Sequence, residues 1–255
     1  MHAMATATLP RLDAPFHWQG DHIAAELPHA KALFTTRRGG VSPAPYATLN
    51  LGRLTEDDPA NVDENRRRVA AATDCPRERF LYGRQVHGAS VRRATEPPGP
   101  KRPPAEEDGQ ATALRRHPAL VFVADCLPIV LAADGAVAVI HAGWRGMAAG
   151  VLANGVAALE EVGGRGPVTA LMGPGARGCC YEVGDEVHAA FAGYDARRGE
   201  RNLDLPAIAA AKLDEAGVAQ IADLGLCTMC WFGLFFSHRR DGGVTGRQAG
   251  IVWLD

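Results

Sequence analysis

The sequence has no apolar run long enough to cross a bilayer as a helix, and it has no strong charge of either sign. The formal net charge is −2 over 255 residues, so no global field indicates nucleic acid or a membrane surface as partner. The N-terminal residues lack the basic segment and following apolar segment of a secretory signal. These absences predict a cytoplasmic protein without nucleic-acid or membrane partners.

Several catalytic signatures are missing as well. There is no dinucleotide-binding fingerprint, no P-loop and no Gly-x-Ser-x-Gly nucleophile elbow. The six cysteines in 255 residues do not resemble a secreted disulfide scaffold, which indicates a reducing compartment.

One cysteine pair has zinc-site spacing, Cys227-x-x-Cys230, but no second Cys-x-x-Cys or His-x-x-x-His accompanies it. The adjacent Cys179 and Cys180 would complete a set of four only if folding brought them there. Because cysteine often packs as a small hydrophobic residue, we expect Cys227 and Cys230 to be buried thiols.

The composition is that of an ordinary globular protein, with 47% hydrophobic and 22% charged residues. Residues 1 to about 14 are small, polar and broken by proline, which predicts a frayed or disordered terminus. No repeat or clean linker divides the rest, so residues 15–255 are expected to form a single catalytic domain. Strands and helices mix without strict alternation, and hairpin signals occur at Asp134-Gly135 and at Asp241-Gly242-Gly243. We therefore predict an α+β fold with a mixed sheet.

Apolar periodicity and turn residues also predict the individual elements. Helices are expected at residues 58–72, 147–162, 185–192 and 205–215, with one helical turn near 111–116. Strands are expected at residues 80–91 and 167–172, and residues 217–225 are expected to lead into a strand. The chain closes with an apolar segment at 249–254, and the proline-rich residues 96–107 are expected to form a surface loop.

A hairpin at the centre of the chain carries the strongest functional signal. The apolar runs Leu127–Ala133 and Ala136–Ile140 flank Asp134-Gly135, which is typical of a type I′ turn with positive φ at both central residues. If Ala133 and Ala136 close the turn, Pro128 lies opposite His141. Cys126 and His141 then become diagonal neighbours on one face of the sheet, about 7–8 Å apart at the backbone.

A thiolate and an imidazole at that distance can share a metal or form a nucleophile–base pair. The alternative is a buried hairpin with a small hydrophobic Cys126 and a hydrogen-bonded core His141. Asp125 favours the functional interpretation, because a carboxylate within an apolar run is costly unless it is paired. His87 beside Gly88 completes the best triple. Two imidazoles and one thiolate suit zinc or copper and leave a fourth position for water or substrate.

Two loops are candidate binding elements. Arg37 and Arg38 precede Gly39-Gly40, where guanidinium groups and free amides could hold phosphate or carboxylate, or form only a solvated turn. Asn50 lies in the loop Leu49–Gly52 and could hold a ligand or cap a turn.

Several segments together resemble one protein family. They are Thr35–Ser42, Leu49–Gly52, Gln85–Gly88, Asp125–Pro128, His141–Gly146, Tyr181–Gly184 and Thr245–Ala249, in that order. This combination is similar to the laccase-domain family, also called polyphenol oxidase or peptidoglycan editing factor. The resemblance extends from about Ala32 to Leu254.

The resemblance implies a single-domain α/β sandwich of the kind shared with a bacterial toxin deamidase. It implies a metal, usually zinc, held by His87, Cys126 and His141. Family members are associated with phosphorolysis of adenosine, inosine and methylthioadenosine, with adenosine deamination and, for some, with copper-dependent phenol oxidation. Arg37 and Asn50 match positions that face substrate or phosphate. The loops Gly173–Arg177 and Trp231–Gly233 depart from the family pattern.

We therefore expect a zinc-dependent purine nucleoside phosphorylase that binds a purine nucleoside and phosphate, as a monomer or small homo-oligomer. Arg37 and Arg145 would hold phosphate. Cys126 and His141 would be catalytic, with Asp125 as a proton carrier in deamination.

Three alternatives remain open at this point. One is a cysteine hydrolase or deamidase with Cys126 as nucleophile and His141 as base. A copper-dependent polyphenol oxidase is another, weakened because nine scattered histidines do not supply the His-x-His pairs of a multicopper enzyme. The third is a non-enzymatic metal-binding or editing factor.

Overall fold

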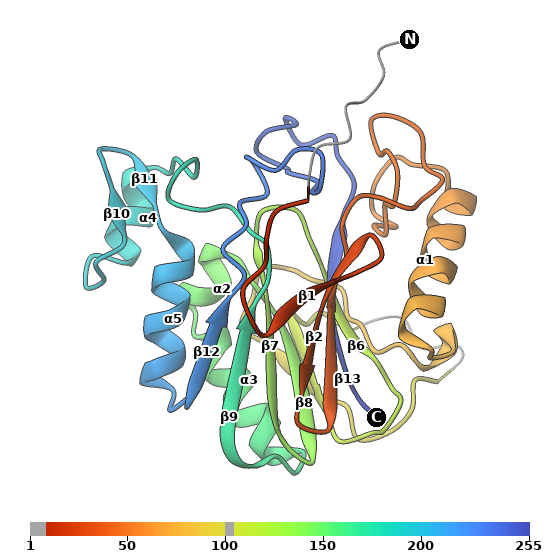
Figure 1. Cartoon of the computed structure of the whole chain (residues 1–255). Coiled ribbons are helices and arrows are strands. Elements are labelled where there is room, and N and C mark those ends of the chain that lie inside the picture. The colour runs from red at the N-terminus through yellow and green to blue at the C-terminus, as the bar shows by residue number, and fades with distance from the viewer. Residues whose placement is uncertain (1–8, 100–104) are drawn as a thin grey trace.

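Two β-sheets packed face to face form the centre of the structure, a computed structural model that describes residues 9–99 and 105–255 (Figure 1). The first sheet is antiparallel throughout, in the order β1 (Phe16–Gln19), β2 (His22–Leu27), β3 (Ala30–Phe34), β13 (Gln248–Leu254) and β6 (Ala119–Val123). The second has the order β12 (Gln220–Asp223), β9 (Arg165–Met172), β7 (Leu127–Asp134), β8 (Ala136–Ala142), β5 (Gly109–Thr112) and β4 (Val91–Arg93). Its two outer pairs are parallel and its inner pairs antiparallel, so the predicted mixed sheet and α+β class are confirmed.

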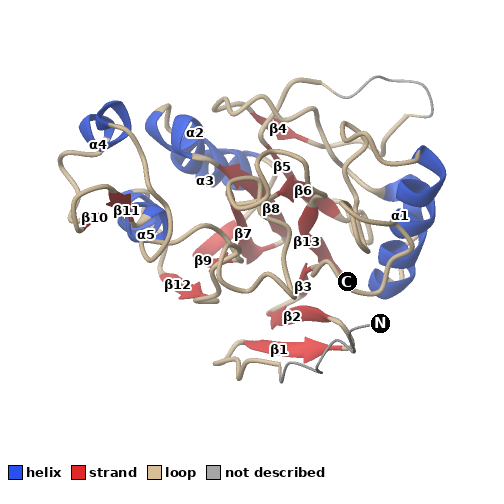
Figure 2. Ribbon diagram, turned by 90° about the horizontal axis from the view of Figure 1, so that it is seen from above, coloured by secondary structure: helices blue, strands red, loops and turns tan. Residues whose placement is uncertain are grey.

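Helices cover the outer faces of both sheets, which gives four layers (Figure 2). Helix α1 (Pro59–Thr73) packs against the first sheet. The second sheet is covered by α2 (Trp144–Ala148), α3 (Val151–Glu161), α4 (Asp185–Ala190) and α5 (Leu205–Glu215). The short elements η1 (Arg77–Arg79), β10 (Arg197–Arg198) and β11 (Asn202–Leu203) complete the described part.

The central hairpin is apolar along its whole length because both of its faces are buried. Val130 and Val139 face the first sheet, whereas Leu131 and Ile140 face the helices, and all four side chains are fully buried. A strand covered on both sides needs apolar residues at every position, which explains the unbroken runs in the sequence.

The predicted register of this hairpin is confirmed, since Pro128 lies opposite His141 and Ala133 opposite Ala136. The predicted type I′ turn is wrong. Gly135 has a φ of +81°, but Asp134 lies outside the left-handed region and continues β7, where it pairs with Arg165. Pairing with β9 therefore determines the conformation at Asp134.

The predicted helix at residues 147–162 is instead two helices. Helix α2 ends at Ala148, and α3 begins after Gly150, whose φ of +89° no α-helix accommodates. By contrast, α1 has bounds within one residue of the prediction, and the Asp58 carboxylate caps it by accepting a hydrogen bond from the amide of Ala60. Helix α5 has the predicted bounds, and α4 ends two residues early.

Three further predictions fail because tertiary pairing overrides local patterns. Residues 80–91 form a loop with single bridges at Leu81 and Arg84, and the strand starts at Val91. Residues 109–112 form β5 against β8, although a helical turn was expected near residues 111–116. The Asp241-Gly242-Gly243 turn joins no hairpin, because the next strand begins at Gln248.

Part of the predicted frayed terminus, residues 1–8, lies outside the described residues, as do residues 100–104 of the proline-rich loop. From Leu9 onward the chain lies against the first sheet: Pro10 accepts a hydrogen bond from the indole of Trp18, and Leu12 packs on the core. No helix in the described ranges is long and apolar enough to cross a membrane.

Candidate active site

One end of the second sheet gathers the three predicted metal ligands. Cys126 immediately precedes β7, and His141 lies near the end of β8, its antiparallel partner. His87 comes from the loop before β4. The antiparallel pairing therefore places the Cys126 and His141 side chains at the same edge, as the register predicted.

The ligand atoms of His87, Cys126 and His141 all lie within 4.8 Å of one another. The two imidazole rings meet edge to face, with centroids 4.8 Å apart and an interplanar angle of 75°. His141 is buried, Cys126 is half-buried and His87 is exposed. The cluster therefore opens to solvent on the side of His87.

A buried carboxylate that sequence reasoning missed, Asp108, supports the cluster. Its Oδ1 accepts hydrogen bonds from His141 Nδ1 at 2.7 Å and from the backbone amide of His87 at 2.9 Å. Its Oδ2 accepts from the amides of Gly88 at 2.7 Å and Val86 at 3.2 Å. The only local signal was an Asp-Gly pair, which is typical of an ordinary turn.

Burial would raise the pKa of Asp108, but the hydrogen bonds from His141, Gly88 and Val86 outweigh it, so the pKa is lowered. The ionised carboxylate can only accept, so His141 must donate from Nδ1, which leaves Nε2 as the ligand atom. The hydrogen bond from its backbone amide to Asp108 holds His87 at a φ of +60°, a conformation that is uncommon for residues other than glycine.

Cys126 and His141 also favour each other's charged forms. Burial would raise the pKa of Cys126, but the charge of His141 and hydrogen bonds from both imidazoles lower it to about 6. Burial would lower the pKa of His141, but the thiolate and Asp108 raise it to about 9. The side chains therefore stabilise a thiolate beside an imidazolium.

The donor set fits a metal ion. Two imidazoles and a thiolate are the ligands that zinc and copper prefer, and a carboxylate behind one imidazole is the usual support of a zinc histidine. His87, Cys126 and His141 would be the ligands, and Asp108 would orient His141.

Both carboxylate oxygens of Asp125 are engaged in hydrogen bonds within the protein. Its φ is +91°, and its Oδ1 and Oδ2 accept hydrogen bonds from the Thr228 hydroxyl and the Arg239 amide, each at 2.7 Å. Its carbonyl accepts from the amide of Ala176. Asp125 thus connects three loops around Cys126.

Asn50 is fully buried and its polar atoms are engaged within the protein. Its Nδ2 donates to Thr55 and Asp57, and its Oδ1 accepts from the amides of Gly52 and Arg247. Asn50 thus joins its loop to the segment before β13. Its contact with substrate stays a prediction.

The two predicted phosphate-binding arginines lie in different surroundings. Arg37 is half-buried over the ring of Phe236 and donates to the carbonyls of Ala47 and Phe232. Burial and the charge of Arg240 lower its pKa. Arg145 is exposed and stacks on Trp144.

Other residues near Cys126 were not among the predicted site residues. Arg239 lies over the ring of Tyr181, and burial and the charge of Cys126 raise the pKa of Tyr181 to about 12. Arg247 is also close enough for the thiolate to favour its charge, although burial lowers its pKa overall. The sequence pattern did not single out these residues, because arginines in polar loops are common.

A hollow of about 1080 Å³ lies away from this site, between α1 and residues 74–78.

Most of the chain matches the model of a known protein family. Residues 31–255 match the model of a family described as multi-copper polyphenol oxidoreductase laccase. The chain belongs to this family. The match confirms the resemblance carried by the segments from Thr35 to Ala249, and it covers both sheets except β1 and β2.

Relatives within the laccase family include proteins named purine nucleoside phosphorylase. One from Corynebacterium glutamicum is 38% identical over 88% of this chain and 94% of its own length. Another, YfiH of Escherichia coli, is 38% identical over 88% of this chain and 93% of its own length.

Solved structures of the laccase family have the same fold. The protein NMB0706 of Neisseria meningitidis superimposes with a TM-score of 0.83 at 35% identity, covering 92% of this chain and 100% of its own. YfiH of Bacillus licheniformis gives a TM-score of 0.87 at 29% identity, covering 95% and 100%.

Proposed function

We propose that this protein is a zinc-dependent purine nucleoside phosphorylase whose substrates are a purine nucleoside, such as adenosine, inosine or methylthioadenosine, and phosphate. The observation that carries the proposal is the cluster of His87, Cys126 and His141 backed by Asp108. Relatives named for this activity are 38% identical over nearly their whole length, which supports it.

Phosphorolysis breaks the bond between the ribose C1′ and the purine N9 and forms a bond between C1′ and a phosphate oxygen. The protein must bind a dianion beside a ribose that becomes cationic. Arg37 and Arg145 are proposed to bind phosphate through charge-assisted hydrogen bonds. Arg239 and Arg247 join this proposed set, because their charges lie near Tyr181 and Cys126.

The zinc would supply a Lewis acid that polarises a bound substrate oxygen or nitrogen. The chain's own groups orient it: Asp108 keeps the proton of His141 on Nδ1, and the amides of the His87 loop fix Asp108 in turn. Asp125 is proposed to position the loops that carry Cys126 and Arg239, since both of its oxygens already accept hydrogen bonds.

Adenosine deamination is a second reaction proposed for the same site. It replaces the 6-amino group of the purine with oxygen from water and needs no phosphate. Inosine formed from adenosine in phosphate-free buffer, and lost in Cys126→Ala, would support it. Copper-dependent phenol oxidation stays an alternative that the family's description brings.

The test of the phosphorylase is product analysis with adenosine, with and without phosphate, alongside elemental analysis for zinc and copper. We expect adenine and ribose 1-phosphate only with phosphate, and we expect Cys126→Ala to lose this activity together with one equivalent of zinc. Arg37→Ala should raise the KM for phosphate by about 10- to 100-fold, because a charged hydrogen bond contributes about 1.5–3 kcal/mol. Arg67→Ala, which changes an exposed arginine of α1, is the matched control. No purine product under any condition would overturn the proposal.

The cysteine hydrolase alternative is favoured by one observation, the contact between Cys126 and His141. Iodoacetamide distinguishes the two functions. A metal-ligating Cys126 reacts only after a chelator removes the ion. A nucleophilic Cys126 reacts at once without a chelator, and its alkylation abolishes the activity of the enzyme.

A further inference from the structure

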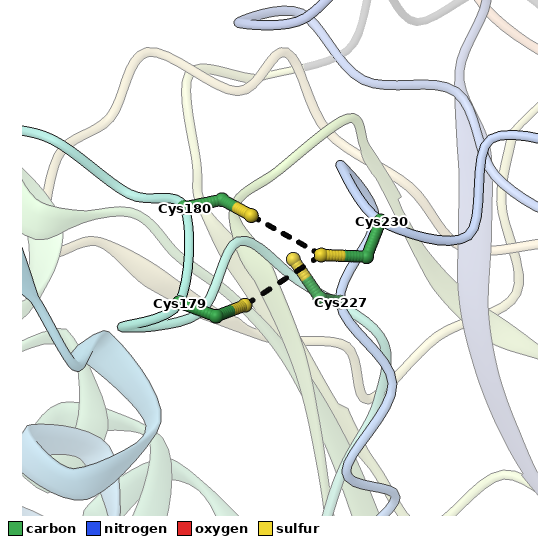
Figure 3. A group of neighbouring side chains, drawn as sticks. All are labelled: Cys179, Cys180, Cys227 and Cys230. Carbon is green, nitrogen blue, oxygen red and sulfur yellow. Dashed lines mark hydrogen bonds between the residues drawn. The ribbon is translucent and has the colours of Figure 1, made fainter.

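A second group of metal-ligating side chains lies outside the proposed active site. The Sγ atoms of Cys179, Cys180, Cys227 and Cys230 all lie within 4.8 Å of one another (Figure 3). Cys230 Sγ is 3.7 Å from Cys179 Sγ and 3.1 Å from Cys180 Sγ. The expectation that Cys227 and Cys230 are two buried thiols is therefore wrong, since Cys230 is exposed and joins a cluster of four.

The backbone determines this meeting of two distant segments. Strands β9 and β12 are parallel neighbours, so the loops that follow them leave the sheet at the same edge. The pairing continues beyond the strands: Gly175 bridges Cys227, and the amide of Thr228 donates to the Gly175 carbonyl at 3.0 Å. Cys227 is thereby held close to the loop that carries Cys179 and Cys180.

The surroundings of Cys227 suit a sulfur that bears negative charge. Burial would raise the pKa of Cys227, but the nearby backbone amides of Cys230, Arg177 and Met229 lower it. The guanidinium of Arg177 is close as well and is held by two hydrogen bonds to Asp223. Amide and cationic partners of this kind orient thiolate ligands and offset their charge.

The sulfur spacing fits a single ion. Zinc–sulfur bonds of about 2.3 Å in a tetrahedron put the sulfurs about 3.8 Å apart, close to the separation of Cys179 and Cys230. A disulfide would require two sulfurs at about 2.05 Å and would leave the other two thiols without a role. Four thiolates in a tetrahedron select zinc or iron, and a site closed by four protein ligands is structural.

We propose that Cys179, Cys180, Cys227 and Cys230 bind one structural zinc ion, separate from the metal of the proposed active site. The ion joins the loop after β9 to the loop after β12. These loops carry Tyr181, which stacks with Arg239, and Thr228, which donates to Asp125. The second ion therefore stabilises one wall of the active site without taking part in its chemistry, and it does not depend on the reaction proposed above.

Zinc content per folded chain tests the proposal. We expect two equivalents in the wild type, two in the control Cys75→Ser, whose buried thiol belongs to neither cluster, and one in the double variant Cys179→Ser/Cys230→Ser. The decisive variant is His87→Ala/Cys126→Ala, which keeps the four cysteines and should retain one equivalent. Loaded with cobalt(II), this variant should give the intense thiolate charge-transfer absorption of a tetrahedral tetrathiolate site.

The unaltered protein offers a second measurement that does not depend on folding of a variant. The exposed Cys179 and Cys230 should resist iodoacetamide until a chelator is added, and then react. Immediate alkylation, a disulfide among the four cysteines in non-reduced peptides, bound iron in place of zinc, or a metal-free His87→Ala/Cys126→Ala protein that folds would each overturn the proposal. Absence of phosphorolysis in wild-type protein that holds both zinc equivalents would overturn only the proposed function.

Discussion

The carboxylate of Asp108 joins two of the proposed metal ligands, His141 and His87. One of its oxygens accepts from the ring of His141, and both accept from the loop that presents His87. The carboxylate is fully buried, so its charge depends on these donors. A single side chain therefore sets the tautomer of one proposed ligand and the position of another.

Replacing this carboxylate should weaken zinc binding even in protein that remains folded. In Asp108→Asn the amide group would face backbone donors, and His141 would lose its anionic partner. We expect zinc affinity to fall by about 10- to 100-fold, as for other carboxylates that support a zinc histidine. Competition with a chromophoric chelator measures this affinity.

Asp57→Asn is the matched control, because Asp57 is another buried carboxylate, bonded to Ser42 and Asn50. It should lower stability and leave zinc affinity of the folded protein unchanged. Equal zinc affinity in Asp108→Asn and the wild type would remove Asp108 from the proposed site.

At the scale of elements, a buried side chain of α1, that of Asn65, joins the helix to loops of the first sheet. Asn65 Nδ2 donates to Ser42 Oγ and to the carbonyls of Thr48 and Asn50, and its Oδ1 accepts from the amide of Val41. The loop thus held continues from Arg37, so this contact reaches the proposed phosphate-binding residue.

Asn65→Ala should therefore destabilise the protein by about 2–4 kcal/mol, because several buried partners lose their hydrogen bonds together. Urea unfolding measures the change. Asn61→Ala, on the same helix and outside this set of bonds, should change stability by less than about 0.5 kcal/mol. Similar losses in the two variants would show that the helix, and not this contact, determines the effect.

At the scale of the whole molecule, the two sheets approach closely where β13 crosses β7. A Cβ atom on Gly250 would lie 2.5 Å from the Cβ of Pro128 and 3.5 Å from the ring of Phe34. Glycine is therefore required at this position by interlayer packing. The contact lies just behind the start of β7, where Cys126 lies.

Gly250→Val should cost about 1–3 kcal/mol of folding free energy through overpacking between the sheets. Thermal or urea unfolding would detect it. The control is Gly193→Val, since a Cβ there meets nothing within 4 Å. Stability of Gly250→Val equal to that of the control would mean that the sheets can separate without cost.

Local patterns predicted the elements that local physics controls. The hairpin register, the extent of α1 and the bounds of α5 depend on residues near one another in the chain, and each was predicted to within a residue. Prediction failed at residues 109–112, where β8 offers an edge to pair with. It also failed at Asp134, where β9 determines the backbone conformation.

For the candidate site, the sequence alone singled out the candidate ligand triple and predicted the proximity of Cys126 to His141, because a two-residue turn aligns its flanking strands. Tertiary structure decided the remainder. Asp108 reaches His141 only because β5 pairs with β8, and Cys179 meets Cys230 only because β9 and β12 are parallel neighbours. Such contacts join residues from 33 to 51 positions apart, and spacing along the chain carries no information about pairs that only the sheet order brings together.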